Sequence, residues 1–416
     1  MSCSVMTVLR RSRSSSSYCH APNTFLTAPH SPQLSYSCKI LMGILYRSLA
    51  SLIVISNFLS EIAGIKKFDR VPVVIPAENR TALKKYIAVV ADGKDLTQSE
   101  AEEAMDIIMS DAATDAQIAA FLAFLRAKGE TIDEITGFAR IMRKKASIVP
   151  AAKSAVDIVG TGGDLANSFN ISTTSSFVIS ATGLNVAKHG NRSVSSKSGA
   201  ADVLEALGVK IGMTPAQASA CMQETGIAFL FAQSFHSAMR FVGKARREMG
   251  VRTVFNILGP LANPALSDYI LLGVYDEKLL ETMAKVLMNL GVKGAMIVYG
   301  DGLDEVSVSG PTSVCELRDN KLIKYTIQPE DFGIKRAPKS EIVGGSPADN
   351  AKITYDILSG KEKGAKRDIV LLNAGCAIYC TGAAASIGDG INLAREAIDS
   401  GKALTKLEKL KEFTNK

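Results

Sequence analysis

The chain has 416 residues, 47% of them hydrophobic and 21% charged, a composition typical of a globular protein long enough for two domains. Its formal charge is +7, but Arg10, Arg11, Arg13, Lys39 and Arg47 all lie in the first 60 residues, which contain no acid. The other 43 basic and 41 acidic residues nearly balance, which excludes an extended polyanion-binding surface, and we expect no nucleic-acid partner.

Residues 1–70 are predicted to be a transit peptide or a disordered leader. The segment is rich in serine, carries arginine and lacks acids up to Glu61, which is typical of organelle transit peptides. A disordered tail and a wrongly assigned gene start are the alternatives. Ile40 to Leu59 is apolar enough for a membrane span, but Arg47 near its middle would cost about 2.5–3.5 kcal/mol on insertion. The composition therefore favours a transit peptide over a membrane anchor.

Residues 80–148 are predicted to form a small all-helical domain. Thr97 is followed three residues later by Glu100, and Thr131 by Glu134, which is the capping-box pattern of a helix start. Between them DAQIAAFLAFLRAKG reads as an amphipathic helix that ends at Gly129. No strand-like alternation interrupts this region.

Residues 152–416 are predicted to form a larger α/β domain with a mostly parallel central sheet. The runs VDIVG, LNVAKHG, AFLFA, YILLGV and AMIVYG alternate with helical stretches, which favours crossover helices between parallel strands. Part of residues 236–262 is expected to pack with the helical domain. In such sheets ligands bind beyond the carboxyl ends of the strands, so we expect the functional loops there.

The cysteines give little sign of a metal site or a disulfide framework. Cys376 and Cys380 are four residues apart in an apolar run, a spacing that could bind metal or form a bond, but no second pair and only four histidines occur in the chain. Buried free thiols are the favoured interpretation.

Several strand ends carry residues suited to an anion. The run GTGGD, from Gly160 to Asp164, presents backbone amides, although alone it is also an ordinary glycine turn. NSFNISTTSS begins a helix with hydroxyls, where either N-capping or an anion site is expected. KHGNRSVSS adds fixed positive charge and hydroxyl donors at the end of the next strand.

Two further motifs could complete such a site. Asp304 and Glu305 are adjacent acids after a strand; such pairs are usually solvated, but beside phosphates they hold Mg²⁺. The segment AMRFVGKARREMG places several cations on one helix, of which one inward arginine could hold a carboxylate in bidentate fashion.

Taken together, these motifs closely resemble the anthranilate phosphoribosyltransferase family. The resemblance rests on GTGGD, the N-x-S-T pattern from Asn170 to Thr173, KHGNRSVSSKSGAADVLEALG, NILGPLANP from Asn256 to Pro264, and the Asp304–Glu305 pair. They occur in order from about residue 80 to the C-terminus. The resemblance implies transfer of the phosphoribosyl group of phosphoribosyl pyrophosphate to the amine of anthranilate, the second step of tryptophan synthesis from chorismate. It also implies a homodimer formed through the helical part and, because tryptophan synthesis sits in plastids, a plastid location.

The resemblance also implies roles for individual residues, while no residue is assigned as a general acid or base. Metal positions for Mg²⁺ are Ser172, Asp304 and Glu305. Positions lining the anthranilate route are Gly160, Asn191, Ala200 and Arg246. Contacts to phosphoribosyl pyrophosphate are implied for Gly160, Gly163, Asp164, Ser168, Asn170, Ile171, Ser172, Thr173, Lys188, His189, Gly190, Asn191, Arg192, Ser193, Val194, Ser195 and Ser196.

Two alternatives remain open at this point. Pyrimidine nucleoside phosphorylases share the expected architecture but carry a different sequence in the lysine-containing loop. A non-catalytic relative that binds nucleic acid on a basic surface is disfavoured by the nearly neutral body and the intact acid pair.

Overall fold

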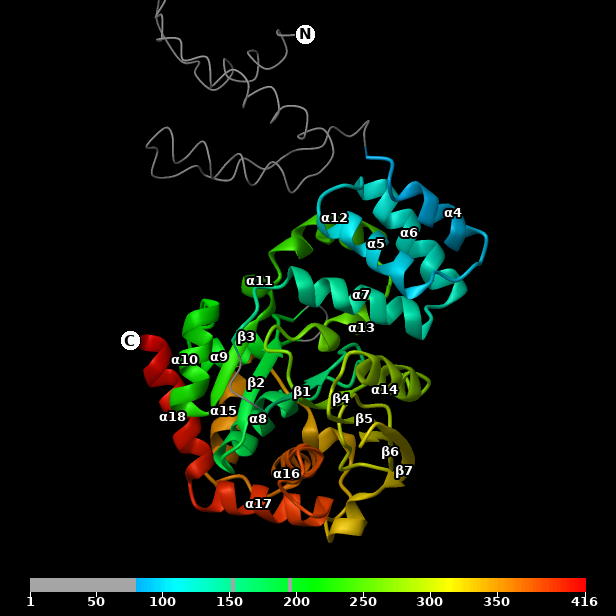
Figure 1. Ribbon diagram of the computed structural model, residues 1–416. Coiled ribbons are helices and arrows are strands. Elements are labelled where there is room, and N and C mark those ends of the chain that lie inside the picture. Colours follow the sequence, from blue (N-terminus) through cyan, green and yellow to red (C-terminus); the bar gives the residue numbers. More distant parts are fainter. Residues whose placement is uncertain (1–79, 151–153, 194–196) are drawn as a thin grey trace, which may run out of the picture. The chain divides into compact units, whose positions relative to one another are not determined.

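A computed structural model describes residues 80–150, 154–193 and 197–416 (Figure 1). The predicted leader and Val194, Ser195 and Ser196 of the lysine-containing loop lie outside these residues. The apolar segment from Ile40 to Leu59 lies outside them as well, and among the described residues no helix has the length and hydropathy needed to cross a membrane.

The first part of the described chain, from residue 80 to Lys145, is all-helical, as predicted. Its helices are α4 (Lys84–Ala91), α5 (Gln98–Met109), α6 (Asp115–Lys128) and α7 (Ile132–Lys145). The expected capping boxes at Thr97 and Thr131 are both present, and a third begins α6 at Thr114. Gly129 ends α6 with φ 88°. α4 packs on α6 and α5 on α7, and α12 (Arg240–Met249) also packs against α5 and α6.

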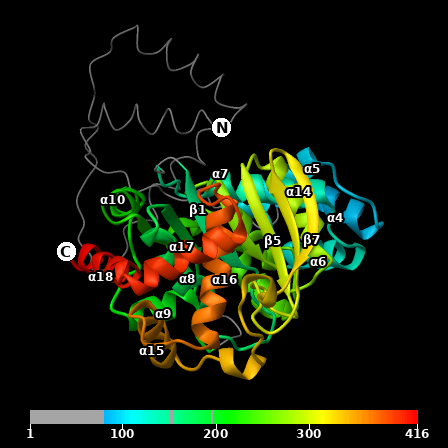
Figure 2. The same ribbon diagram turned by 90° about the horizontal axis from the view of Figure 1, so that it is seen from below.

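The rest of the described chain builds one seven-stranded sheet in the order β3-β2-β1-β4-β5-β6-β7. Neighbouring strands are parallel from β3 to β5, which confirms the mostly parallel α/β fold. The strands β5 and β7, which flank β6 in the sheet, can be followed in Figure 2. The strands are β1 (Ala155–Gly160), β2 (Asn185–Gly190), β3 (Ile227–Phe231), β4 (Tyr269–Gly273), β5 (Gly294–Gly300), β6 (Thr312–Arg318) and β7 (Lys321–Ile327).

The antiparallel edge of the sheet was not expected. β6 pairs with β5 and with β7, and the hairpin turn between β6 and β7 is Asp319–Asn320. Both turn residues have positive φ, 49° and 57°, the conformation of a two-residue hairpin turn that Asp and Asn tolerate. The Asp-Asn pair was the available signal in the sequence, since the polar and apolar residues on either side of it alternate only in part.

Alternate residues of the strands face two separate cores. Ile158, Leu271 and Met296 belong to the core that contains α8 (Ile171–Ala181) and α16 (Ala365–Cys380). Ile270 and Ile297 face the other core, which contains α14 (Leu279–Asn289) and the N-terminal helices. Because strands buried on both faces are held rigidly, the loops at their carboxyl ends have a fixed base.

Further helices surround these layers, and α16 packs against both α8 and α17. The remaining α-helices are α9 (Ala200–Ala206), α10 (Pro215–Thr225), α11 (Ala232–Phe235), α13 (Phe255–Leu258), α15 (Pro347–Leu358), α17 (Ile387–Asp399) and α18 (Lys402–Asn415). The described cysteines are free and buried, which confirms their interpretation as buried free thiols; they are Cys221, Cys315, Cys376 and Cys380.

Candidate active site

The strand order places a reversal of direction beside β1. The chain proceeds outward from β1 through β2 to β3, then returns to β4 on the other side of β1. Ligands of open α/β sheets bind at the carboxyl ends of strands next to such a switch point. The loops after β1, β2 and β5, where the predicted motifs lie, meet at this place.

Glycines allow the loop after β5 to approach β1 and β4 closely. A Cβ atom at Gly160 would overlap the Asp304 carboxylate, and one at Gly273 would overlap the Asp304 backbone. The amide of Gly162 donates to Oδ2 of Asp304 at 2.6 Å. The first glycine of GTGGD is therefore needed for a close approach of protein to protein, in addition to any contact with a ligand.

Glu305 caps the N-terminus of α8 from a distant part of the chain. Its Oε1 accepts from the Ser172 amide at 3.2 Å and from the Ser172 hydroxyl. The side chain of Asn170, at the N-cap position, does not cap the helix. Its amide instead donates to the Ser198 carbonyl at 3.1 Å, and its Oδ1 accepts from Asn350 at 2.9 Å. The positive end of α8 thus already faces a carboxylate.

The acids of the site carry unfavourable negative charge. Burial, Asp164 and Glu305 together raise the pKa of Asp304 well above its usual range. Burial raises the pKa of Glu305 to about 7, although the Ser172 hydroxyl and Lys188 oppose the shift. Oδ2 of Asp164 is buried without a hydrogen-bond partner among the described residues. Such a cluster favours the binding of a cation.

The residues fit a magnesium ion on the chemistry of their donor atoms. Asp304, Glu305 and Ser172 supply hard oxygens. Within the described ranges, no three His, Cys, Asp or Glu side chains are arranged to hold a metal by themselves. Mg²⁺ is commonly bound by one or two carboxylates with water and substrate phosphate oxygens, so the pair agrees with a site that substrate completes.

Lys188 provides a buried positive charge close to these acids. Its side chain lies at the end of β2, only 4% of the residue is exposed, and Nζ donates to the His189 carbonyl at 3.0 Å. Burial lowers the pKa of Lys188, whereas Asp157, Glu305 and Asp304 oppose that shift. The cation and the acid pair therefore act on each other across the carboxyl edge of the sheet.

His189 lies beside a second histidine and is poorly suited to accept a proton. Its ring and that of His236 are 5.2 Å apart between centroids, and both residues are buried. Burial lowers the pKa of His189 to about 3 and that of His236 to about 4. With pKa values this far below 7, both rings are weak bases, and neither is assigned as a general base.

The described end of the lysine-containing loop is fastened to α9. Arg192 forms ion pairs with Asp202 at 3.0 Å and with Glu205 at 2.6 Å. Oδ2 of Asp202 accepts from the Ser193 amide at 3.0 Å, and Oδ1 of Asn191 accepts from the Arg192 amide at 2.8 Å. Arg192, predicted to contact substrate, is thus paired with protein acids in this structure.

Arg252 was missed by the sequence reasoning. Its guanidinium donates to the carbonyl of Gly163, whose φ is 81°, and stacks 4.3 Å from the centroid of the Tyr275 ring. Arg252 therefore helps to fix the conformation of the GTGGD loop. It lies just beyond α12 in the segment Val251–Thr253, where no spacing rule connects it to Gly163.

Ser168 follows the GTGGD loop in the chain and lies against the segment before α15. It forms an isolated antiparallel bridge with Val343, and the amide of Gly344 donates to the Asn167 carbonyl at 2.9 Å. A small hollow there is lined by Ser168, Lys197 and Asn350, among others. Asn350 also was not predicted, although it holds Asn170 in place.

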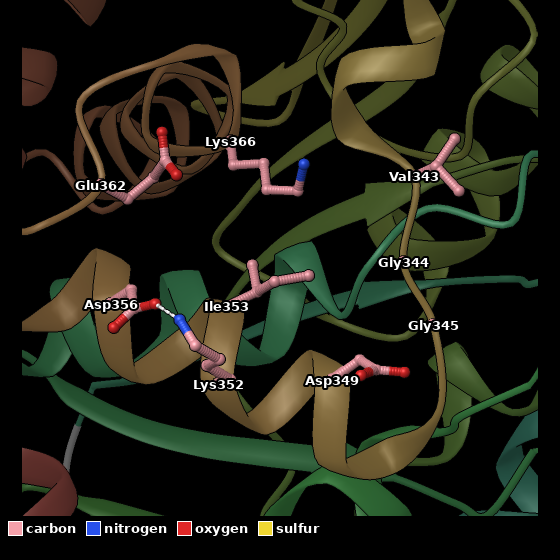
Figure 3. Close-up of a pocket in the computed structure, with 9 residues that line it drawn as sticks. All are labelled: Val343, Gly344, Gly345, Asp349, Lys352, Ile353, Asp356, Glu362 and Lys366. Atoms are coloured by element: carbon pink, nitrogen blue, oxygen red, sulfur yellow. Dashed lines mark hydrogen bonds and ion pairs between the residues drawn. The ribbon is translucent and has the colours of Figure 1, made fainter.

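A larger hollow of about 470 Å³ adjoins this one at Gly344 and Gly345 (Figure 3). Its charged groups are largely satisfied by the protein, since Lys352 pairs with Asp356 and Lys366 donates to the Glu341 carbonyl at 2.5 Å. None of the predicted site residues lines it, and the arrangement of paired charges assigns it no ligand.

The positions predicted to line the anthranilate route are spread over several elements. Gly160 lies against Asp304, and Asn191 accepts from Gln233 at 3.3 Å. Ala200 begins α9, close to Gly190. Arg246 is half-buried on α12 over the Phe255 ring, 5.2 Å from its centroid, and burial lowers its pKa. Across the described residues its guanidinium makes no hydrogen bond or ion pair, which leaves its donors for a ligand.

Comparison with known proteins gives one consistent result. A family model described as the glycosyl transferase family a/b domain matches residues 152–404, and one for the helical bundle domain of that family matches residues 84–146. Anthranilate phosphoribosyltransferase of Methanobrevibacter smithii is 54% identical over 334 residues, 80% of this chain and 99% of the relative.

Solved structures agree with this similarity. The crystal structure of anthranilate phosphoribosyltransferase from Thermus thermophilus has a TM-score of 0.77 at 41% identity and covers 80% of this chain and 99% of that chain. The enzyme from Saccharomyces cerevisiae in complex with PRPP and Mg has a TM-score of 0.75 at 29% identity, covering 80% and 98%.

Proposed function

This chain belongs to the anthranilate phosphoribosyltransferase family, and from that premise we propose how its own residues perform the family's reaction. It transfers the phosphoribosyl group of 5-phosphoribosyl 1-pyrophosphate to the amine of anthranilate, with Mg²⁺ as cofactor. The products are N-(5-phosphoribosyl)anthranilate and pyrophosphate. The observation that carries the assignment to this site is the meeting of Lys188, Ser172 and the Asp304–Glu305 pair at the carboxyl edge of the sheet.

Phosphoribosyl pyrophosphate would be held by the loops after β1 and β2. The Gly162 and Ser172 amides already donate to carboxylates of the loop after β5, so the donors would be the amides of Gly163 and Asp164. Lys188 would add its positive charge. Magnesium, bound by Asp304 and Glu305 with Ser172 nearby, would supply neutralisation of charge on the departing pyrophosphate. The same residues keep the donor substrate oriented with its anomeric carbon toward the acceptor.

Anthranilate needs orientation more than activation. Its aromatic amine is neutral at pH 7 and already nucleophilic, so holding it in line with the anomeric carbon can supply much of the acceleration. Arg246 has a half-buried guanidinium with no protein carboxylate among its described contacts, which suits the anthranilate carboxylate. No protein nucleophile is required, and neutral His189 is given no acid or base role.

An assay of the purified chain tests this assignment. With Mg²⁺, phosphoribosyl pyrophosphate and anthranilate, we expect anthranilate consumption and pyrophosphate release in equal amounts. Phosphorolysis of a pyrimidine nucleoside in place of this reaction would support the nucleoside phosphorylase alternative. Binding of single-stranded DNA in a gel shift without turnover would support the non-catalytic one.

The location and assembly of the protein are further parts of the proposal. The acid-free, serine-rich leader supports import into a plastid, followed by removal of roughly the first 70 residues. A chain that begins at Val71 should be soluble and active, and residues 1–70 should direct a fluorescent protein to plastids. An insoluble truncated chain together with membrane partitioning of the full chain would support an anchor instead.

We also propose a homodimer formed through the helical region. Phe124 on α6 is 42% exposed, an apolar side chain that a partner could cover. Sedimentation should give twice the mass of one chain, and Phe124→Glu should shift the equilibrium toward monomer if this face is used. A monomeric wild-type chain would contradict the proposal.

A further inference from the structure

The motif NILGPLANP, from Asn256 to Pro264, has no role in the reaction described above. The structure places its Asn263 in the interior between β1 and β2, with 1% of the residue exposed. Nδ2 of Asn263 donates to the Ala187 carbonyl and to Oδ2 of Asp157, both at 2.8 Å. Oδ1 of Asn263 accepts from the Ala265 amide at 2.8 Å. The side chain is therefore fully engaged and fixed in one orientation.

Asn263 and Asp157 occupy an opening in the sheet. β1 pairs with β2 only at Ala155↔Asn185 and Val156↔Val186. By contrast, β1 stays paired with β4 as far as Gly160↔Gly273, and β2 with β3 as far as Gly190↔Phe231. Beyond Val156, side chains thus replace backbone pairing between β1 and β2. The opening therefore lies in the carboxyl-terminal halves of β1 and β2, toward the sheet edge that carries the candidate active site.

These two side chains hold the peptide groups on either side of Lys188. Asn263 donates to the carbonyl of Ala187, and Oδ1 of Asp157 accepts from the amide of His189 at 3.2 Å. In a fully paired sheet the β1 backbone would bind these two groups of β2, the Ala187 carbonyl and the His189 amide. Here two side chains bind them instead. The position of Lys188 on β2 depends on both contacts.

Charge supports the same relationship. Lys188 faces Asp157 from β1 and Asp304 and Glu305 from the loop after β5, with neutral His189 beside it. Among the three acids, Asp157 contributes most to opposing the loss of the Lys188 proton caused by burial. Burial raises the pKa of Asp157, while Lys188 and the hydrogen bonds from Asn263 and His189 oppose that shift.

We propose that Asp157 and Asn263 are positioning residues that hold the Lys188 ammonium at the opening between β1 and β2, where it meets the anionic groups of phosphoribosyl pyrophosphate. The inference rests on the proposed function, because Lys188 must itself contact that substrate. Neither Asp157 nor Asn263 touches the reacting atoms, so both act through Lys188.

A double-mutant cycle separates action through Lys188 from a general structural role. Lys188→Met should lower kcat/KM for phosphoribosyl pyrophosphate by about 10²–10³-fold, the range for removing one electrostatic stabiliser. Asp157→Asn should lower it by roughly 10-fold or more, with a smaller effect on the KM for anthranilate. The double variant should be no worse than Lys188→Met alone, because residues that act as a unit are not additive.

Folding is controlled for with matched variants. If Asp157→Asn does not fold, Asn263→Ala takes its place in the double-mutant cycle with Lys188→Met. Thr225→Val removes a buried hydroxyl that bonds the Ile227 carbonyl at the amino end of β3, and should lower stability while leaving kcat/KM unchanged. Equal losses of kcat/KM in Thr225→Val and Asp157→Asn would overturn the proposal.

The outcomes also distinguish this proposal from the proposed function. Additive losses in the double variant, or wild-type kcat/KM in Asp157→Asn and Asn263→Ala, would overturn the positioning role while the reaction stands. A wild-type chain without anthranilate turnover, or a fully active Lys188→Met, would instead overturn the assignment of the site itself.

Discussion

Helices α5 and α8 meet the same requirement at their N-termini in different ways. In α5 the first free amides are bonded by Thr97 and Glu100, which lie within four positions of each other. In α8 the amide of Ser172 is bonded by Glu305, 133 residues away in the chain. A local cap stabilises its own helix, whereas the distant cap brings a carboxylate to the carboxyl edge of the sheet.

The difference separates residues that serve stability from residues that serve the reaction. The helical region closes its capping boxes by itself and needs nothing from the α/β domain to do so. The site around Asp304 instead brings together buried acids with raised pKa values, whose negative charge a bound cation would compensate. Changes in the two regions should therefore affect different measurements.

The largest expected effect is on catalysis, from neutralising the acid pair. Asp304→Asn combined with Glu305→Gln keeps the shape and removes two charges, so kcat should fall by about 10²–10³-fold. Activity should become dependent on higher Mg²⁺, while Tm without the metal should change little. The checks are steady-state kinetics over a Mg²⁺ series and thermal unfolding. An unchanged kcat with unchanged Mg²⁺ dependence would contradict the metal assignment.

A smaller and more selective effect is expected at Arg246. Arg246→Ala should raise the KM for anthranilate by roughly 10-fold or more, because a charge-assisted pair with the carboxylate is lost. The KM for phosphoribosyl pyrophosphate should change much less. Arg247→Ala, the exposed neighbour on the same helix, is the matched control. Equal effects on both substrates would move the role away from Arg246.

The next expected effect is on stability: buried His236 should make the free energy of unfolding depend on pH. An unfolded histidine binds a proton below about pH 6.5, but folded His236 does so only near its pKa of about 4. The unfolded chain binds more protons in this window, so stability is complete above pH 6.5 and is lost as the pH falls toward 4.

Replacing His236 should remove the part of the pH-dependent loss of stability that this histidine causes. At pH 5.5, one unit below the unfolded pKa, that share is about 1.4 kcal/mol. Urea unfolding of His236→Gln at pH 7.5 and 5.5 should therefore show a smaller difference than the wild-type chain. An identical pH difference in the two proteins would argue that His236 is protonated in the folded state.

The smallest effect is expected at a local cap. Thr97→Ala should reduce the free energy of unfolding by about 1 kcal/mol, the usual value for a lost N-cap. Neither kcat nor either KM should change, because within the described part of the chain the Thr97 side chain bonds only Glu100 of its own capping box. Denaturant unfolding and the standard assay check this. A loss of activity larger than the loss of stability would show that the helical region is coupled to the site.

Much of the fold could be predicted because its signals are short in range. Thr97 with Glu100, Thr131 with Glu134, and Gly129 fix helix ends through contacts within a few residues, and each occurs as predicted. The apolar runs that became β1 to β5 are buried on both faces, which their composition indicated. The β6–β7 hairpin was missed because its outer strand is largely exposed and its apolar pattern is weak.

By itself the sequence determined the fold class, the family and the motifs that lie at the strand ends, because each is written in residues close together or in motifs of fixed order. Only the tertiary structure decided which partners these residues have. It joined Glu305 to Ser172, Arg252 to Gly163, and Asp157 with Asn263 to the peptides around Lys188. The physical reason is that a buried polar group must find a partner somewhere in the folded chain, and packing, not sequence spacing, brings that partner within reach.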